Sequence, residues 1–365
     1  MKRNPFIVTF TLLTLFFHFY CSRQQSQWNG NIEEVNGVSV VYNPKQPIYS
    51  NEVLIFEEDL NIGDENKGEN YQFGRIRAIT TDDNENIYVL DGIECNVKKY
   101  DKNGNYILSF GGKGDGPGEF DVPTGLYFKK DRELIVSSFD KLSFFDLQGD
   151  LQRSIKARLF TSQFDSQGNI YAVQRIPGDK FYLKLIKYND KVEELLTIAQ
   201  IEKEPPGPDK KIDAVAEVIF YTIFNNDYIA WSSNYKYDIS IVDTAGNITK
   251  RIVKNYEPKE YTDQDRQAFL NDNSRVPESR FSFPEYFPPI RFISSDDEGR
   301  IYVMTYETNS EGIRCYDVFG SEGKFIAKIP FKYHPVHWRN GKFYCIAEDS
   351  EGFHIVKRYN TFWKI

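Results

Sequence analysis

Short apolar blocks recur six times along the chain, each of them directly after a polar run. The polar runs are rich in Asp, Asn and Gly, which accept local hydrogen bonds or tolerate positive φ and so suit tight hairpins. Another short apolar segment precedes most of these runs, so each copy is predicted to hold two antiparallel strands joined by a turn. The six blocks lie at residues 86–89, 133–136, 169–172, 227–230, 300–303 and 342–345.

A third strand and a second polar turn follow most of the blocks, as at residues 98–105, 144–150, 240–247 and 315–324. A fourth strand then completes the unit, as at residues 106–110 and 325–329. Four antiparallel strands in a repeat of roughly 40–50 residues are typical of a propeller blade. The chain is therefore predicted to be an all-β protein, a six-bladed β-propeller of four-stranded antiparallel blades that occupies residues 37–365.

This span is too long for six ordinary blades, so the sequence requires insertions, which we place at about residues 199–217 and 253–289. The first is charged and rich in Pro. In the second, Thr262 followed by Asp265 is typical of a capping box, which predicts a short helix through Leu270. The Pro-rich segment 284–289 is expected to end the insertion.

The last repeat has no long fourth strand of its own, because the sequence stops at Ile365. Residues 53–60 form an apolar run that belongs to no blade. We predict that this N-terminal strand closes the ring as the outer strand of the last blade, which removes an open sheet edge.

The N-terminus reads as an export signal, with Lys2 and Arg3 ahead of an apolar run at residues 6–20. The signal resembles that of a bacterial lipoprotein, in which Cys21 would be lipidated, although residues 18–20 are not the small residues such a signal prefers. We assign residues 1–21 to the signal and 22–36 to a polar tether. An uncleaved N-terminal anchor and a free secreted form are the alternatives. The expected location is the cell envelope, with the membrane reached through the N-terminus.

Composition narrows the possible partners. The formal net charge is −8, from 45 basic and 53 acidic residues, and no Lys- or Arg-rich block could follow a phosphate backbone, so we expect no nucleic acid partner.

Phe and Tyr (29 and 24) greatly outnumber Met (2), which favours strands. Beyond Cys21, three scattered cysteines make neither a disulfide framework nor a C-x-x-C site.

Residues 110–123 combine a glycine-rich turn with Gly-Pro-Gly-Glu-Phe and a Pro that enters the next strand. This segment is similar to the linker between blades in NHL-repeat propellers. Residues 37–44 resemble the exported bacterial branch that is known only as six-bladed propellers. The resemblance covers about residues 37–360 and implies the fold, but one fold hosts many activities.

Catalytic and cofactor signals are weak. Propeller enzymes of the amidating-lyase type take His ligands from several blades, whereas the four histidines here lie at positions 18, 334, 337 and 354. No motif matches the carboxylate metal sites of gluconolactonases, and no Ser/His/Asp arrangement is readable. Residues 111–118 lack the Gly-Lys-Ser or Gly-Lys-Thr of a phosphate loop. We therefore expect no cofactor, no metal and no catalytic residue, with a metal-assisted hydrolase or lactonase as the alternative.

Two similar segments, 76–83 and 290–297, place Arg77 and Arg291 at equivalent positions on innermost strands near one mouth of the channel. Guanidinium groups there could bind a carboxylate or sulfate, or could instead form salt bridges to local Asp residues between blades. Loops 91–94, 231–235 and 306–309 should share that mouth, which adds Asp91, Trp231 and Tyr306 as candidates. The leading hypothesis is a non-catalytic propeller that binds a protein, peptide or carbohydrate, and the alternative for these loops is packing.

Overall fold

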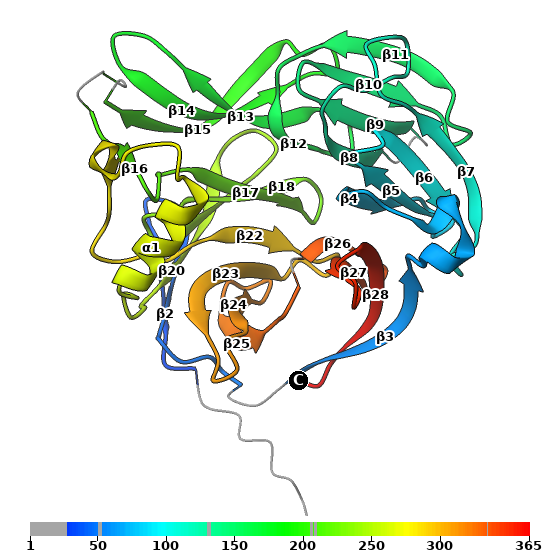
Figure 1. Ribbon diagram of the computed structural model, residues 1–365. Coiled ribbons are helices and arrows are strands. Elements are labelled where there is room, and N and C mark those ends of the chain that lie inside the picture. Colours follow the sequence, from blue (N-terminus) through cyan, green and yellow to red (C-terminus); the bar gives the residue numbers. More distant parts are fainter. Residues whose placement is uncertain (1–27, 50–52, 130–132, 205–206, 208–209, 334) are drawn as a thin grey trace, which may run out of the picture.

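The computed structural model describes residues 28–49, 53–129, 133–204, 207, 210–333 and 335–365. Six four-stranded antiparallel sheets surround a central axis, which confirms the predicted six-bladed propeller (Figure 1). In blades 1 to 3 the strands are, from the centre outward, β4 (Ile76–Thr81), β5 (Ile87–Asp91), β6 (Asn96–Tyr100), β7 (Tyr106–Gly111); β8 (Pro123–Lys129), β9 (Glu133–Ser138), β10 (Lys141–Phe145), β11 (Leu151–Lys156); β12 (Phe160–Phe164), β13 (Ile170–Ile176), β14 (Phe181–Tyr188), β15 (Glu194–Lys203).

The other three blades follow the same order. Blade 6 takes its outer strand from the N-terminal part of the chain. Their strands are β17 (Ile219–Phe224), β18 (Tyr228–Ser233), β19 (Asp238–Val242), β20 (Ile248–Lys254); β22 (Phe292–Ser295), β23 (Ile301–Thr308), β24 (Arg314–Phe319), β25 (Phe325–Pro330); β26 (Pro335–Arg339), β27 (Lys342–Glu348), β28 (His354–Trp363), β3 (Leu54–Ile62).

The recurring polar run and apolar block form one hydrogen-bonded hairpin. In blade 1 the buried Asp82 carboxylate accepts bonds from the backbone amides of Asn84 and Asn86 and from the Asn86 side chain, and the Tyr88 hydroxyl donates to it at 3.0 Å. Asp165 with Tyr171 and Asp296 with Tyr302 repeat this pattern in blades 3 and 5. The Tyr ring packs in the core between blades, and its hydroxyl donates a hydrogen bond to the buried carboxylate of the turn Asp. The need for both contacts explains why the two residues recur at a fixed spacing.

Residues 53–60 close the ring as predicted, because β3 pairs antiparallel with β28 in register from Leu54 opposite Trp363 to Ile62 opposite Val356. Leu54 and Ile62 are buried at the two ends of this strand. The last blade thereby gains its fourth strand, and the ladder joins the two ends of the propeller.

The N-terminal segment also holds two other blades, which we did not predict. Strand β2 (Val38–Asn43) adds parallel to β20 of blade 4, and β1 (Asn31–Val35), which we placed in the tether, pairs with β2. The backbone of Ile48 and Tyr49 then bonds to blade 5. We call residues 28–49 and 53–62 the strap, because they run along the outer edges of blades 4, 5 and 6 (Figure 1).

Asn43 fixes the strap between blades 4 and 5. Its buried side chain donates to the Gly323 carbonyl at 2.9 Å and accepts from the Phe325 amide at 2.7 Å and from the Trp28 indole at 3.2 Å. One amide side chain therefore satisfies backbone groups of a turn that lies 280 residues further along the chain.

Both insertions lie between blades and meet each other. The predicted capping box of Thr262 and Asp265 is present and begins helix α1 (Asp263–Asp272). After the short helix η3 (Glu278–Arg280), β21 (Phe281–Ser282) pairs parallel with β16 (Ile212–Asp213) of the other insertion. None of the helices in the described residues is long and apolar enough to span a membrane.

Candidate functional site

The propeller has two unlike faces, which we define by their turns. The hairpin face carries the turns between the first and second strands and between the third and fourth strands of each blade. The crossover face carries the segments that join blades, including both insertions, and the turns between second and third strands. These last turns lie at residues 92–95, 139–140, 177–180, 234–237, 309–313 and 349–353.

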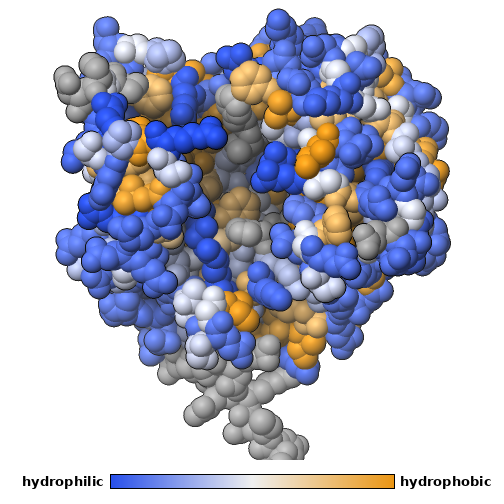
Figure 2. All heavy atoms as spheres, viewed as in Figure 1, coloured by the Kyte–Doolittle hydropathy of each residue, from blue (hydrophilic) through white to orange (hydrophobic). Residues whose placement is uncertain are grey.

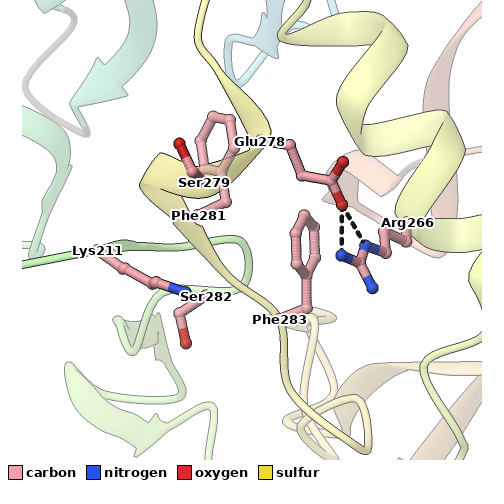
Figure 3. Close-up of a pocket in the computed structure, with 7 residues that line it drawn as sticks. All are labelled: Lys211, Arg266, Glu278, Ser279, Phe281, Ser282 and Phe283. Carbon is pink, nitrogen blue, oxygen red and sulfur yellow. Dashed lines mark hydrogen bonds and ion pairs between the residues drawn. The ribbon is translucent and has the colours of Figure 1, made fainter.

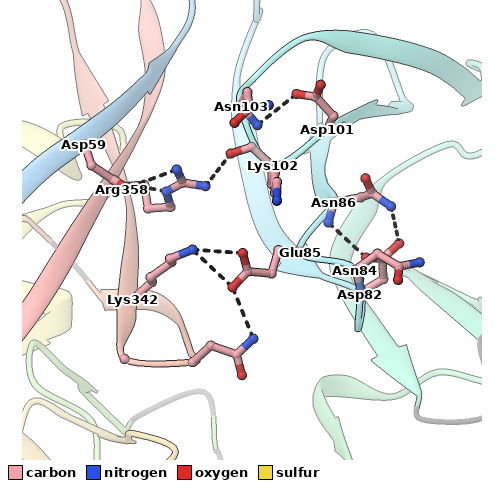
Figure 4. Close-up of polar contacts among 12 residues, drawn as sticks. Asp59, Asp82, Asn84, Glu85, Asn86, Asp101, Lys102, Asn103, Lys342 and Arg358 are labelled. Atoms are coloured by element: carbon pink, nitrogen blue, oxygen red, sulfur yellow. Dashed lines mark hydrogen bonds and ion pairs between the residues drawn. The ribbon is translucent and has the colours of Figure 1, made fainter.

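Charged groups on the hairpin face are paired across the seam between blades 6 and 1 (Figure 4). Lys342 contacts both carboxylate oxygens of Glu85 at 3.1 and 2.9 Å, and this contact holds the pKa of Glu85 below its usual value. Arg358 binds Asp59 through two nitrogens and donates to the carbonyl of Lys102. These contacts tie the strap to blade 1 and give the charges of this seam a structural role.

Most arginines on the crossover face have no such partner, although Arg266 in the second insertion is paired with Glu278. Arginines with a carboxylate partner include Arg300 and Arg339 on the hairpin face and Arg153 and Arg251 on outer strands. The arginines for which the described part of the chain supplies no carboxylate partner gather on the crossover face. They are Arg75, Arg77, Arg158, Arg175, Arg275, Arg291 and Arg314. Around the central opening, hydrophilic side chains border a hollow (Figure 2).

The two predicted arginines lie on this face, at the starts of inner strands as expected. Arg77 is exposed, and its side chain packs so closely over Gly92 that a Cβ there would come within 2.5 Å of the arginine Cγ. Arg291, directly before β22, holds its guanidinium 5.2 Å from the ring centroid of Tyr306. Neither forms an ion pair within the described residues.

Tyr306 stacks on Phe287, with ring centroids 4.3 Å apart and an interplanar angle of 18°. Burial raises the pKa of Tyr306, and the Arg291 charge partly opposes that rise. The phenol therefore stays neutral at physiological pH. With Arg291 it forms an aromatic and cationic edge between blade 5 and the second insertion.

Exposed apolar side chains mark the same face, and the sequence analysis missed them. Five of the six blades present one at or beside the turn between the second and third strands, namely Ile93, Phe139, Ile176, Tyr235 and Phe353. We call these five residues the apolar crown. Ile93 is 58% exposed and Phe353 is 49% exposed. The turns of the hairpin face themselves carry no comparably exposed large apolar residue in the described part of the chain, but Leu195 and Ile248, 54% and 41% exposed, lie just after two of these turns on β15 and β20.

Two predicted site residues have structural roles. The Asp91 carboxylate is fully buried and accepts backbone N–H bonds from Gly74, Arg75, Ile93 and Glu94. It therefore shapes the crossover-face loops and has little capacity left for a ligand. Trp231 packs in the core between blades 3 and 4. Cys21 lies outside the described residues.

Two buried titratable side chains lie on the first two strands of blade 6. Burial lowers the pKa of His337 to about 3, and its Nε2 lies 2.9 Å from the Thr81 hydroxyl at the seam of blades 6 and 1. Burial also raises the pKa of Cys345 to about 12, so this thiol stays protonated. Among the described residues no group of three His, Cys, Asp or Glu side chains is placed to hold a metal ion.

The protein is therefore a six-bladed β-propeller, one face of which carries both exposed apolar side chains and several arginines. The chain belongs to the DUF5128 family, described as a 6-bladed beta-propeller, whose family model matches residues 68–266. No curated protein matches the sequence significantly.

Solved structures share the fold at low sequence identity. A Bacteroides fragilis protein to which export is ascribed has a TM-score of 0.55 at 11% identity, over 87% of this chain and 99% of that chain. Virginiamycin B lyase from Staphylococcus aureus gives 0.46 at 12% identity, over 84% of this chain and 99% of that chain. The likeness to the Bacteroides fragilis protein shows a common fold and does not determine activity.

Proposed function

We propose that this protein is an exported, membrane-tethered and non-catalytic propeller that binds another extracytoplasmic protein through its crossover face. The observation that carries the proposal is the gathering of the apolar crown and the unpaired arginines on one face. The hairpin face lacks the crown, and Arg300 and Arg339 there are already paired.

The composition of the face favours a protein as the partner. Aromatic residues and Arg are enriched in protein–protein interfaces, and they account for most residues whose truncation costs binding energy. Phe139 shows how the two types combine here, because the guanidinium of Arg158 lies 4.7 Å from its ring centroid. Because the described part of the chain gives these arginines no carboxylate partner, the binding partner is expected to supply Asp and Glu side chains that complement them.

Export and tethering rest on the N-terminal signal and Cys21, and the ascribed export of the Bacteroides fragilis neighbour agrees with them. Replacing Cys21 by Ser separates the anchoring alternatives. A lipoprotein should lose its membrane association in this variant. Unchanged association without lipid in either form would show that an uncleaved anchor holds the protein.

The binding proposal can be tested by photo-crosslinking in the intact cell envelope. A photoreactive amino acid at position 139 or 353 should crosslink to one protein of defined mass, and the same group at position 102 on the hairpin face should not. An Arg77→Glu/Arg291→Glu background should reduce the crosslink severalfold. Equal crosslinking from both faces, or none from the crossover face, would rule out the proposal.

A further inference from the structure

The two insertions border an open pocket of about 570 Å³ on the crossover face, lined by Lys211, Arg266, Glu278, Ser279, Phe281, Ser282 and Phe283 (Figure 3). Neither insertion is needed to complete a blade. In repeat proteins, insertions on one face often build the binding surface. This volume lies in the ordinary range of ligand sites, roughly 300–1,000 Å³.

The lining combines an apolar floor with one available cation. Phe281 is buried and Phe283 is partly buried at the base of the cavity. Arg266 is held in place, since it donates two hydrogen bonds to Glu278 and lies 4.8 Å from the ring centroid of Phe283. Lys211 is exposed and has no carboxylate partner in the described part of the chain, and it lines the same pocket as Ser282 (Figure 3).

Part of the pocket wall is extended backbone, which belongs to the ribbon formed by β16 and β21. Lys211 directly precedes β16, and Phe281 and Ser282 form β21, so the cavity lies against the two-stranded parallel ribbon. Each strand of this ribbon pairs only with the other among the described residues. With two residues in each strand, the ribbon offers at most a short edge to a further strand, as in recognition by strand addition.

Aromatic contacts connect the cavity to the mouth of the channel. Phe283 contacts Tyr261 at 6.0 Å between ring centroids, Tyr261 contacts Phe287 at 4.7 Å, and Phe287 stacks on Tyr306 beside Arg291. A row of packed aromatic side chains therefore leads from the pocket to the mouth of the channel.

We propose that this cavity binds the C-terminal end of a polypeptide. The terminal carboxylate pairs with Lys211 and the Ser282 hydroxyl, and an apolar final side chain lies on Phe281 and Phe283. A carboxylate would give Lys211 a partner that the described part of the chain does not supply, and strand addition to the short ribbon edge would favour a peptide over an acidic sugar. This inference rests on the proposed function, because it names the part of the partner that the crossover face holds.

The test uses the full-length protein and a fluorescent hexapeptide that ends in two leucines, as the free acid and as the C-terminal amide. The acid should bind about tenfold more tightly than the amide by fluorescence anisotropy. Lys211→Ala should abolish this difference, whereas Lys102→Ala, which removes an exposed lysine from the hairpin face, should preserve it. Circular dichroism confirms that both variants fold.

Three results would overturn the inference: equal affinity for acid and amide, no binding of either at millimolar concentration, or an unchanged preference in Lys211→Ala. Displacement of the peptide by a uronic acid trimer at equal concentration would assign the cavity to carbohydrate instead. If the peptide test fails but Arg77→Glu/Arg291→Glu still reduces crosslinking in the envelope, only the role of the cavity is wrong.

Discussion

Leu54 provides a quantitative test of ring closure. It is fully buried at one end of β3 and packs with residues of blade 5, including Tyr302 and Met304. Leu54→Ala should cost about 2–5 kcal/mol, as in other large-to-small core substitutions, out of a total stability of about 5–15 kcal/mol. The matched control is Ile107→Ala on β7, the outer strand of blade 1, because Ile107 is 45% exposed and should change stability by no more than about 0.5 kcal/mol.

The assay is urea unfolding followed by tryptophan fluorescence, together with hydrogen exchange of the backbone amides. Closure through the β3–β28 ladder predicts faster exchange in β3 and β28 of the Leu54→Ala protein, with exchange in β13 and β14 unchanged. Deletion of residues 53–60 should expose the whole edge of β28 and cause aggregation. The reasoning is refuted if Leu54→Ala and Ile107→Ala unfold at the same urea concentration with identical exchange patterns.

Three further substitutions test individual contacts. Asn43→Ala leaves the buried Phe325 amide without its acceptor and should lower the free energy of unfolding by about 1–3 kcal/mol, measured by urea titration; a loss below about 0.5 kcal/mol would contradict the role of Asn43. Asp91→Asn should speed amide exchange in residues 92–95 more than in residues 101–105, since its carboxylate accepts four backbone bonds; equal change in both turns would contradict it. Burial lowers the pKa of His337 from 6.5 to about 3, so between these pH values the unfolded chain binds a proton that the folded protein does not. The free energy of unfolding should therefore decrease as the pH is lowered from 6.5 towards 3. His337→Gln should flatten the dependence of Tm on pH there, and an unchanged slope would exclude this histidine as a cause.

The blades were predictable from sequence because their signal is local. A turn Asp and the Tyr six positions later meet within one hairpin, as Asp82 and Tyr88 do, so spacing alone identifies the unit. The capping box of Thr262 and Asp265 was predictable for the same reason, since both partners lie within one helical turn. The closing strand was predictable because the last repeat lacks its fourth strand.

The strap and the binding face depend on contacts between distant segments. Nothing near Asn43 in the sequence indicates that its side chain bonds to Gly323 and Phe325. In the sequence, an apolar residue such as Phe353 cannot be told from a buried strand residue. Only the structure shows that it lies in a turn and is exposed. Asp91 misled the sequence analysis for the converse reason, because a loop carboxylate gives no sign that four backbone amides enclose it.

Binding of the crosslinked partner by purified protein tests the central claim most directly. The partner identified in the envelope is immobilised, and its affinity is measured for wild type, Arg77→Glu/Arg291→Glu, Phe139→Asp/Phe353→Asp and the hairpin-face control Lys102→Glu. The account predicts at least tenfold weaker binding for both crossover-face variants, about 1.4 kcal/mol or more, and unchanged binding for the control. Wild-type affinity in both crossover-face variants, or a comparable loss in Lys102→Glu, would contradict it.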